Sequence, residues 1–312
     1  MHRTPSLGDN RAVSDSGSEL ALTVTVATND GWSSLRDAYL PLAPQLERPD
    51  VEVLLVDGSR STAPAPEELS STTRWIKMPG ADISEMRMRA YGEARGQIVA
   101  MTEDHVMVPP DWVERILRSH REYPEAAAIG GAVMNGTPHH LVDWATFYAG
   151  HGPFMRPLPQ GPVPYLSGIN VSYKREPFQQ VLAGMGDRAI ETLINEEIKT
   201  RGGVLVADDR MVVSHMQSRG VPETIRLHYH AGRHYEGTRQ DMNKDRAGRA
   251  LRAAALPVPR AAKRLLTVLR RGEPLGRVVR VAPAMVLLVW AQAAGELVGI
   301  FRGPGRSASK LH

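Results

Sequence analysis

Short apolar segments alternate with helical patterns between Leu22 and Met134, and this alternation restricts the possible folds more than any other feature. The segments 22–27 (LTVTVA), 51–56 (VEVLLV) and 97–101 (QIVAM) are each typical of a buried strand. Helical patterns over 33–45 and 83–94 lie between them. Strands that alternate with helices in this way predict a parallel sheet of the α/β class.

Acidic side chains follow two of these strands directly. Asp57 comes after the second strand, and Glu103 and Asp104 come after the strand at 97–101. In open α/β sheets the ligand binds outside the carboxyl ends of the strands. Two acidic strand ends at that edge suit a ribose, a metal ion, or both. The alternative is that each carboxylate only caps the turn or helix that follows it.

The rest of the chain predicts further elements and a change of composition. We expect a helix over 111–123, a strand over 126–134, an acidic helix over 187–200, and two short strands around a turn at 204–215. The predicted organisation is a disordered polar leader at 1–20, an α/β domain at 21–220, a basic helical or loop extension at 221–280, and an apolar helix and tail at 281–312.

Composition excludes several kinds of site and partner. The chain has no cysteine, which excludes a disulfide scaffold, a thiolate zinc site and a cysteine nucleophile, so any metal is held by oxygen or imidazole. Aromatic residues make up only 5% of the chain, and no helix-turn-helix, RNA-recognition or zinc-finger pattern is present. We therefore expect no nucleic-acid partner, although residues 233–280 are strongly basic.

Five motifs occur in an order that resembles family 2 glycosyltransferases, which have the GT-A fold. They are VTVATND with VEVLLVDGS, MRMRAYGEARGQIVAMTEDH, YLSGINVSYKRE, the helix from Glu191 to Gly202, and the pair Val213 and His215. The resemblance covers about residues 20–220. It implies a Rossmann-like mixed sheet flanked by helices, here with a C-terminal, partly apolar helical extension. It also implies sugar transfer from a nucleotide-diphosphate sugar to an acceptor hydroxyl, with inversion.

The resemblance assigns donor and metal roles residue by residue. A divalent cation, Mn²⁺ or Mg²⁺, would neutralise the diphosphate leaving group. His105 stands where the family has its metal-binding Asp, and His215 is a second candidate ligand. The nucleotide-sugar is expected to contact Thr28, Asn29, Asp30, Asp57, Arg87, Glu103 and Asp104. The sequence EDH at 103–105 departs from the usual DxD, which leaves open whether Asp104 contributes and whether a charged His105 faces the diphosphate instead.

Catalysis also needs a base for the acceptor hydroxyl, and the acidic helix supplies candidates. Glu191 is expected to be that base, with Glu196 or Glu197 in its place if the helical register differs. Gly168 and Asn170 match the acceptor-side motif. The acceptor class stays open between a glycan, a lipid-linked molecule and a small molecule. The histidines His228, His230 and His234 lack an acidic partner and are expected in a lid or solvated loop.

The apolar stretch at 281–301 is long enough to cross a bilayer, but Pro283 and Glu296 disfavour a spanning helix. The basic residues between Arg252 and Arg280 suit the anionic cytoplasmic leaflet. We therefore predict a cytoplasmic protein held at the membrane face by this segment, with a helix packed on the catalytic domain as the alternative. The competing function is a non-catalytic GT-A-like protein that binds nucleotide or glycan.

Overall fold

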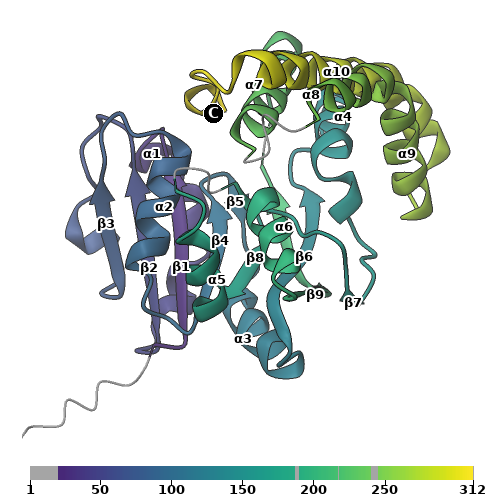
Figure 1. The fold of residues 1–312 in the computed structure, drawn as a ribbon. Helices are drawn as coiled ribbons and strands as arrows, with labels where there is room; N and C mark the ends of the chain where they lie inside the picture. The colour runs from purple at the N-terminus through teal and green to yellow at the C-terminus, as the bar shows by residue number, and fades with distance from the viewer. Residues whose placement is uncertain (1–19, 187–189, 217, 240–244, 312) are drawn as a thin grey trace, which may run out of the picture.

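The chain folds as a mixed sheet flanked by helices, with a layer of C-terminal helices across one end (Figure 1). The computed structural model describes residues 20–186, 190–216, 218–239 and 245–311. Apart from Leu20, the leader expected at 1–20 lies outside these residues. The predicted α/β class and the C-terminal helical extension are confirmed.

Nine strands form one sheet in the order β3-β2-β1-β4-β8-β6-β9-β5, with β7 paired to β9. Their bounds are β1 Leu22–Thr28, β2 Val51–Asp57, β3 Thr73–Lys77, β4 Ile98–Glu103, β5 Val106–Met107, β6 Ala126–Asn135, β7 Gly161–Pro162, β8 Val171–Lys174 and β9 Val204–His215. Strands β1 to β4 are parallel, as their apolar runs predict, whereas β8 is antiparallel to β4 and β6. The sheet is therefore mixed rather than wholly parallel.

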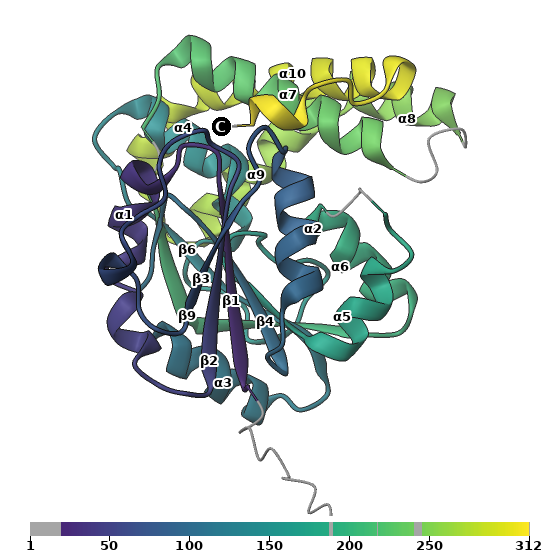
Figure 2. The same ribbon diagram turned by 90° about the vertical axis from the view of Figure 1, so that its left-hand side faces the viewer.

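Helices cover both faces of the sheet and its carboxyl edge. Their bounds are α1 Trp32–Tyr39, α2 Ile83–Glu93, α3 Trp112–Glu122, α4 Leu141–Gly150, α5 Arg175–Leu182, α6 Glu191–Thr200, α7 Val221–Thr238, α8 Arg246–Ala255, α9 Pro257–Arg270 and α10 Leu275–Arg302. Figure 2 shows α2, α5 and α6 on one face of the sheet and α1 on the other, with α7, α8 and α10 above both.

The strand register brings the acidic strand ends to one edge but directs them to two faces. Thr28 pairs with Asp57, and Ala27 pairs with Glu103. Because successive side chains alternate between faces, Asp57 lies on the face of Thr28, and Glu103 lies on the opposite face with Ala27. The sequence thus placed both acids correctly at the carboxyl edge, but they do not share one face of the sheet.

The C-terminal helices belong to the same hydrophobic core as the sheet. Val281, Met285 and Leu288 of α10 are buried in one cluster with Tyr148 of α4 and Val24 of β1. Gly295 and Gly299 of α10 lie against the backbone of α7, where a Cβ would come within 1.9 Å of Tyr229 O and 2.5 Å of Arg233 O. The glycines therefore permit this close approach.

Helix α10 is long and apolar enough to cross a membrane, but 44% of its most apolar window is buried inside the protein. Glu296, the acid within it, is 5% exposed, and both of its oxygens accept hydrogen bonds from Arg260 of α9 at 2.7 and 2.9 Å. Burial raises the pKa of Glu296, and Arg260 opposes that rise. An acidic residue is thus tolerated in this apolar helix because α10 packs on α9, where Arg260 pairs with it.

Two local expectations are wrong. Residues 204–215 form the single strand β9, not two strands around a turn. Where the turn was expected, the pairing with β6 is irregular, because Gly131 pairs with Asp208 and the next residue, Ala132, pairs with Val212. His228, His230 and His234 lie in α7 rather than in a loop, and the last two are buried. The helix forms because α10 covers its inner face, a contact that the local sequence does not reveal.

Candidate functional site

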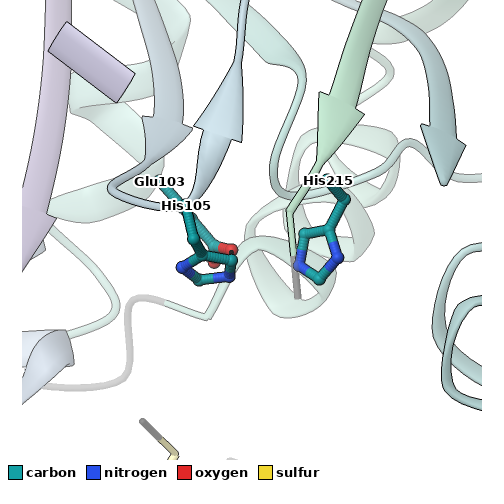
Figure 3. A group of neighbouring side chains, drawn as sticks. All are labelled: Glu103, His105 and His215. Atoms are coloured by element: carbon teal, nitrogen blue, oxygen red, sulfur yellow. Dashed lines mark ion pairs between the residues drawn. The ribbon is translucent and has the colours of Figure 1, made fainter. Parts of the chain in front are cut away.

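Three side chains with metal-binding atoms meet at the carboxyl edge of the sheet. Glu103 ends β4, His105 follows two residues later, and His215 ends β9. Strand β5 pairs antiparallel with β9 and joins Val106 to His215, which brings the distant segments together. One ligand atom from each residue lies within 4.8 Å of the other two (Figure 3). The two histidines that the resemblance named as metal ligands are therefore neighbours. Together with Glu103 they form a metal-binding cluster of three residues.

Charge is distributed unevenly over these groups. His105 Nδ1 lies 2.7 Å from Asp104 Oδ1, and its Nε2 lies 3.2 Å from Glu103 Oε2. Burial lowers the pKa of His105, but the two carboxylates outweigh it and raise that pKa to about 10. Burial also lowers the pKa of His215, well below its usual value, and nearby His151 and His105 add to the effect. His215 is therefore a neutral imidazole at pH 7.

The donor set fits a divalent cation. One carboxylate and two imidazoles are ligands that Mn²⁺ accepts readily, whereas Mg²⁺ prefers oxygen throughout. His105 carries a proton without a metal, so a cation bound there would have to displace it. A bound cation would offset the charge that develops on a diphosphate leaving group.

Arg87 links this cluster to the predicted base. It lies on α2, and its guanidinium donates to Glu103 Oε1 at 2.8 Å and to Glu191 Oε1 at 2.6 Å. The Arg87 side chain is only 14% exposed, so Arg87 is not a solvated helix arginine. One guanidinium thus holds a candidate metal ligand and the candidate base in fixed positions.

Glu191 is a buried carboxylate beside a cavity. It begins α6, and burial raises its pKa while the charge of Arg87 lowers it. Gly168 of the acceptor-side motif lies against it, where a Cβ would come within 3.0 Å of Glu191 Cγ. A cavity of about 360 Å³ is lined by Arg87 and Glu191 on one wall and by His234, Tyr235 and Gln292 of the C-terminal helices on another. The catalytic domain and the C-terminal helices therefore enclose this space jointly.

The residues expected around the nucleotide lie at the same edge. Thr28 Oγ1 donates to Asp104 Oδ2 at 2.6 Å, so the first strand is tied to the EDH segment. Asn29 is partly buried and Asp30 is exposed in the loop that follows. Asp57 is fully buried, where its carboxylate accepts from Ser59 N at 2.7 Å and pairs with Lys77. The capping alternative therefore describes what Asp57 does in this structure.

Asn170 corrects the acceptor-side expectation. Its side chain is fully buried, accepts a hydrogen bond from Trp112 Nε1 at 3.0 Å, and donates to the carbonyls of Ala132 and Met211 at 3.0 Å each. These bonds use its amide to join three core segments. Asn170 therefore supports the fold and does not face an acceptor.

No sequence pattern points to His151 as a site residue. It follows α4, its ring centroid lies 4.5 Å from that of His215, and its buried Nδ1 has no hydrogen-bond partner among the described residues. Burial lowers its pKa to about 4. A lone histidine in an irregular stretch carries no pattern, so only the packing reveals that His151 lies beside the metal-binding cluster.

Comparisons with known proteins concern the sequence and the fold of the chain. The sequence profile described as "Glycosyl transferase family 2" matches residues 23–182. A glucosyl-dolichyl phosphate glucuronosyltransferase of Haloferax volcanii is 21% identical over 234 residues, which cover 69% of this chain and 64% of the relative. The chain thus spans less than two thirds of that relative's length.

A solved structure shares the fold. The mannosyltransferase PcManGT from Pyrobaculum calidifontis, in complex with GDP-Man and Mn²⁺, superposes with a TM-score of 0.56 at 18% identity. The similarity covers 88% of this chain and 86% of that one. It therefore extends beyond the sheet into the C-terminal helices, and it supports the GT-A fold that the sequence resemblance implied.

Proposed function

The chain belongs to glycosyl transferase family 2, and from this premise we propose that it transfers a sugar from a nucleotide-diphosphate sugar to an acceptor hydroxyl, with inversion. The observation that carries the proposal is that Arg87 joins the metal-binding cluster to the candidate base. Glu103, His105 and His215 gather their ligand atoms within 4.8 Å, and Arg87 connects Glu103 to Glu191. A diphosphate-binding centre and a base thus lie next to each other.

The metal-binding cluster would receive the diphosphate. Mn²⁺ suits its ligands best and would act as a Lewis acid when bound. The structural neighbour's complex with GDP-Man and Mn²⁺ supports a nucleotide donor and this metal. Thr28, Asn29, Asp30 and Asp104 lie at the strand ends where the nucleoside would bind.

Glu191 would remove the proton of the acceptor hydroxyl. Its carboxylate lines the 360 Å³ cavity, and Gly168 leaves room for the side chain. Because burial raises the pKa of Glu191, its carboxylate is more basic than an exposed one, while Arg87 keeps it oriented. The acceptor would then enter between α6 and the C-terminal helices.

We expect nucleotide-sugars to raise the melting temperature of the protein only with the metal present. A ligand that binds the native state at 100 times its Kd stabilises it by about 2.7 kcal/mol. Thermal unfolding with UDP-, GDP- and dTDP-sugars, each with Mn²⁺, Mg²⁺ or EDTA, measures this. The same sugars without nucleotide are the control. If every nucleotide-sugar leaves the melting temperature unchanged with both metals, the donor proposal is wrong.

The acceptor site would lie at a membrane surface. The outward face of α10 carries a stripe of exposed apolar side chains at intervals of about one, two or three helical turns: Leu275, Val279, Leu287, Trp290 and Phe301. Arg252, Lys263, Arg270 and Arg280 are exposed on α8, α9 and α10. Exposed apolar and basic side chains together suit a helix that lies in the interface of an anionic leaflet. We propose this for the cytoplasmic leaflet, with α10 lying along it rather than across it.

Charges placed in the apolar stripe should release the protein from vesicles. Leu287→Glu combined with Trp290→Glu is expected to weaken binding to vesicles containing anionic lipid by more than about tenfold, because two apolar side chains lose their burial in lipid. Cosedimentation measures this, and added salt should partly release the wild type. Leu40→Glu is the matched control, since Leu40 is 48% exposed on the catalytic domain and Leu287 is 47% exposed. Equal binding of both variants and the wild type would contradict a role for α10.

A further inference from the structure

The imidazole of His215 has no hydrogen bond that would orient it. A histidine that ligates a metal usually donates its other ring N–H to a carboxylate or a backbone carbonyl, and this bond fixes the orientation of the ring. His105 has such a partner, because its Nδ1 lies 2.7 Å from Asp104 Oδ1. Within the described residues, neither ring nitrogen of His215 has a hydrogen-bond partner. The orientation of the His215 ring therefore depends on packing.

Two imidazole rings pack against His215. The ring centroid of His105 lies 4.8 Å from that of His215, and the two rings are inclined at 73°. The ring centroid of His151 lies 4.5 Å away, with an angle of 49° between the rings. His105 is itself a candidate ligand of the metal-binding cluster. His151 is thus the ring that contacts His215 from outside the cluster.

The contact of His151 with the cluster is made by its ring and not by a nitrogen. Its Nδ1 is buried and has no hydrogen-bond partner among the described residues. His151 is also not one of the residues whose ligand atoms lie within 4.8 Å of one another, which are Glu103, His105 and His215. A role for His151 at this site is therefore a role in packing the ring of His215.

Helix α4 and the residue after it form a row of rings that ends at His215. Trp144, Phe147 and His151 follow one another at intervals of three and four residues, which places their side chains on one side of the helix. The ring centroids of Trp144 and Phe147 lie 6.2 Å apart, and those of Phe147 and His151 lie 6.0 Å apart. The backbone N–H of His151 donates to Phe147 O at 2.6 Å. Phe147 is only 4% exposed, so His151 is held against a buried ring.

The C-terminal helices hold the other end of this row. The guanidinium of Arg277 in α10 lies 4.1 Å from the centroid of the Trp144 ring, which is a cation–π contact. The neighbouring Tyr148 hydroxyl donates to Glu273 Oε2 at 2.6 Å, and Arg277 pairs with Glu273 at 2.8 Å. Helix α4 is therefore tied to α10, which fixes the position of His151 at its carboxyl end.

We propose that His151 is a positioning residue that holds the imidazole of His215 in the orientation in which it binds the cation. This inference rests on the proposed function, because it takes Glu103, His105 and His215 to bind a divalent cation together with the donor diphosphate. A ligand ring that is already held in place loses less conformational freedom when the metal binds, so the affinity for the metal is higher. His151 acts through its ring contact with His215 and does not bind the cation itself.

Three substitutions of His151 in the full-length protein separate the ring from its nitrogen. His151→Ala removes both, His151→Asn keeps a polar nitrogen near the position of Nδ1, and His151→Phe keeps a ring without a nitrogen. Titration of Mn²⁺ in the presence of GDP measures the affinity for the metal. His151→Ala and His151→Asn are expected to weaken Mn²⁺ binding by roughly 10- to 100-fold, as is typical for loss of a partner that orients a metal ligand. His151→Phe should bind Mn²⁺ within a few fold of the wild type.

NMR spectra of isotope-labelled histidine rings measure the orientation of His215 without any metal. The signals of His215 are those missing from the spectrum of His215→Ala. They are expected to shift and broaden in His151→Ala and His151→Asn, because the ring then samples more than one orientation, and to stay sharp in His151→Phe. His139→Ala is the control, since His139 is exposed and outside the cluster, and it should change neither the Mn²⁺ affinity nor the His215 signals. Melting curves show whether each variant is folded, and His151→Asn carries the same expectation if His151→Ala does not fold.

Several outcomes would overturn the proposal. Rescue by His151→Asn but not by His151→Phe would show that the cluster needs a nitrogen at this position and not a ring. Folded His151→Ala with the Mn²⁺ affinity and the His215 signals of the wild type would show that His151 only fills space. If the wild type binds Mn²⁺, a change in one of the two measurements without the other would also contradict the proposal. If the wild type binds neither Mn²⁺ nor any nucleotide-sugar, the proposed function fails, and the metal-free His215 signals still decide whether His151 positions that ring.

Discussion

Glu191→Gln is expected to lower the rate of sugar transfer by roughly 10²- to 10⁴-fold and to leave donor binding within a few fold of the wild type. The amide keeps the size of the carboxylate but cannot accept the acceptor proton. Arg87 would still pair with Glu103 at 2.8 Å, so the diphosphate end of the site should keep its arrangement. Turnover with a saturating donor and thermal-shift titration of GDP with Mn²⁺ measure the two effects separately.

Glu197→Gln is the matched control for that substitution. Glu197 lies on the same helix, but its side chain is partly exposed and pairs with Arg201 at 2.8 Å. It should therefore transfer sugar at the wild-type rate. Normal turnover in Glu191→Gln would exclude Glu191 as the base. A large loss in Glu196→Gln or Glu197→Gln instead would move the role along α6.

The sequence predicted the parts of the site that follow from strand geometry. Parallel strands end at one edge, so Asp57 and Glu103 could be placed there from their position after apolar runs. The motif order then named His105 and His215 from segments more than 100 residues apart. Their proximity depends on the pairing of β5 with β9. This pairing is only two residues long, and no local sequence pattern predicts it.

The sequence failed where long-range packing decides what a polar side chain does. Asn170 matches an acceptor motif, yet its amide satisfies Trp112 and two backbone carbonyls in the core. Arg264 of α9 looks like a surface charge in a basic stretch, but it donates to Gln292 of α10, and burial there lowers its pKa. Composition records how many charges a segment has, and only the tertiary fold decides which side of a helix they occupy.

His215→Ala is expected to abolish the Mn²⁺-dependent part of donor binding and to reduce sugar transfer by at least about 100-fold. His215 is the ligand most ready for a cation, because burial keeps its imidazole neutral. Without it, Glu103 and His105 remain, and His105 already bonds to both Glu103 and Asp104. Loss of the metal removes several kcal/mol of charge stabilisation from the departing diphosphate, and each 1.4 kcal/mol is tenfold in rate.

The control for this last variant is His139→Ala, which removes an exposed imidazole outside the metal-binding cluster. It should keep both the Mn²⁺-dependent rise in melting temperature and the rate of transfer. Calorimetric titration of Mn²⁺ in the presence of GDP then separates metal binding from catalysis. If His215→Ala binds Mn²⁺ and GDP as the wild type does, the cation is held elsewhere. If His215→Ala loses Mn²⁺ binding but its rate of transfer in EDTA matches the wild-type rate, the reaction proceeds without the metal. The positive charges of Arg87 and His105 would then have to stabilise the leaving group alone.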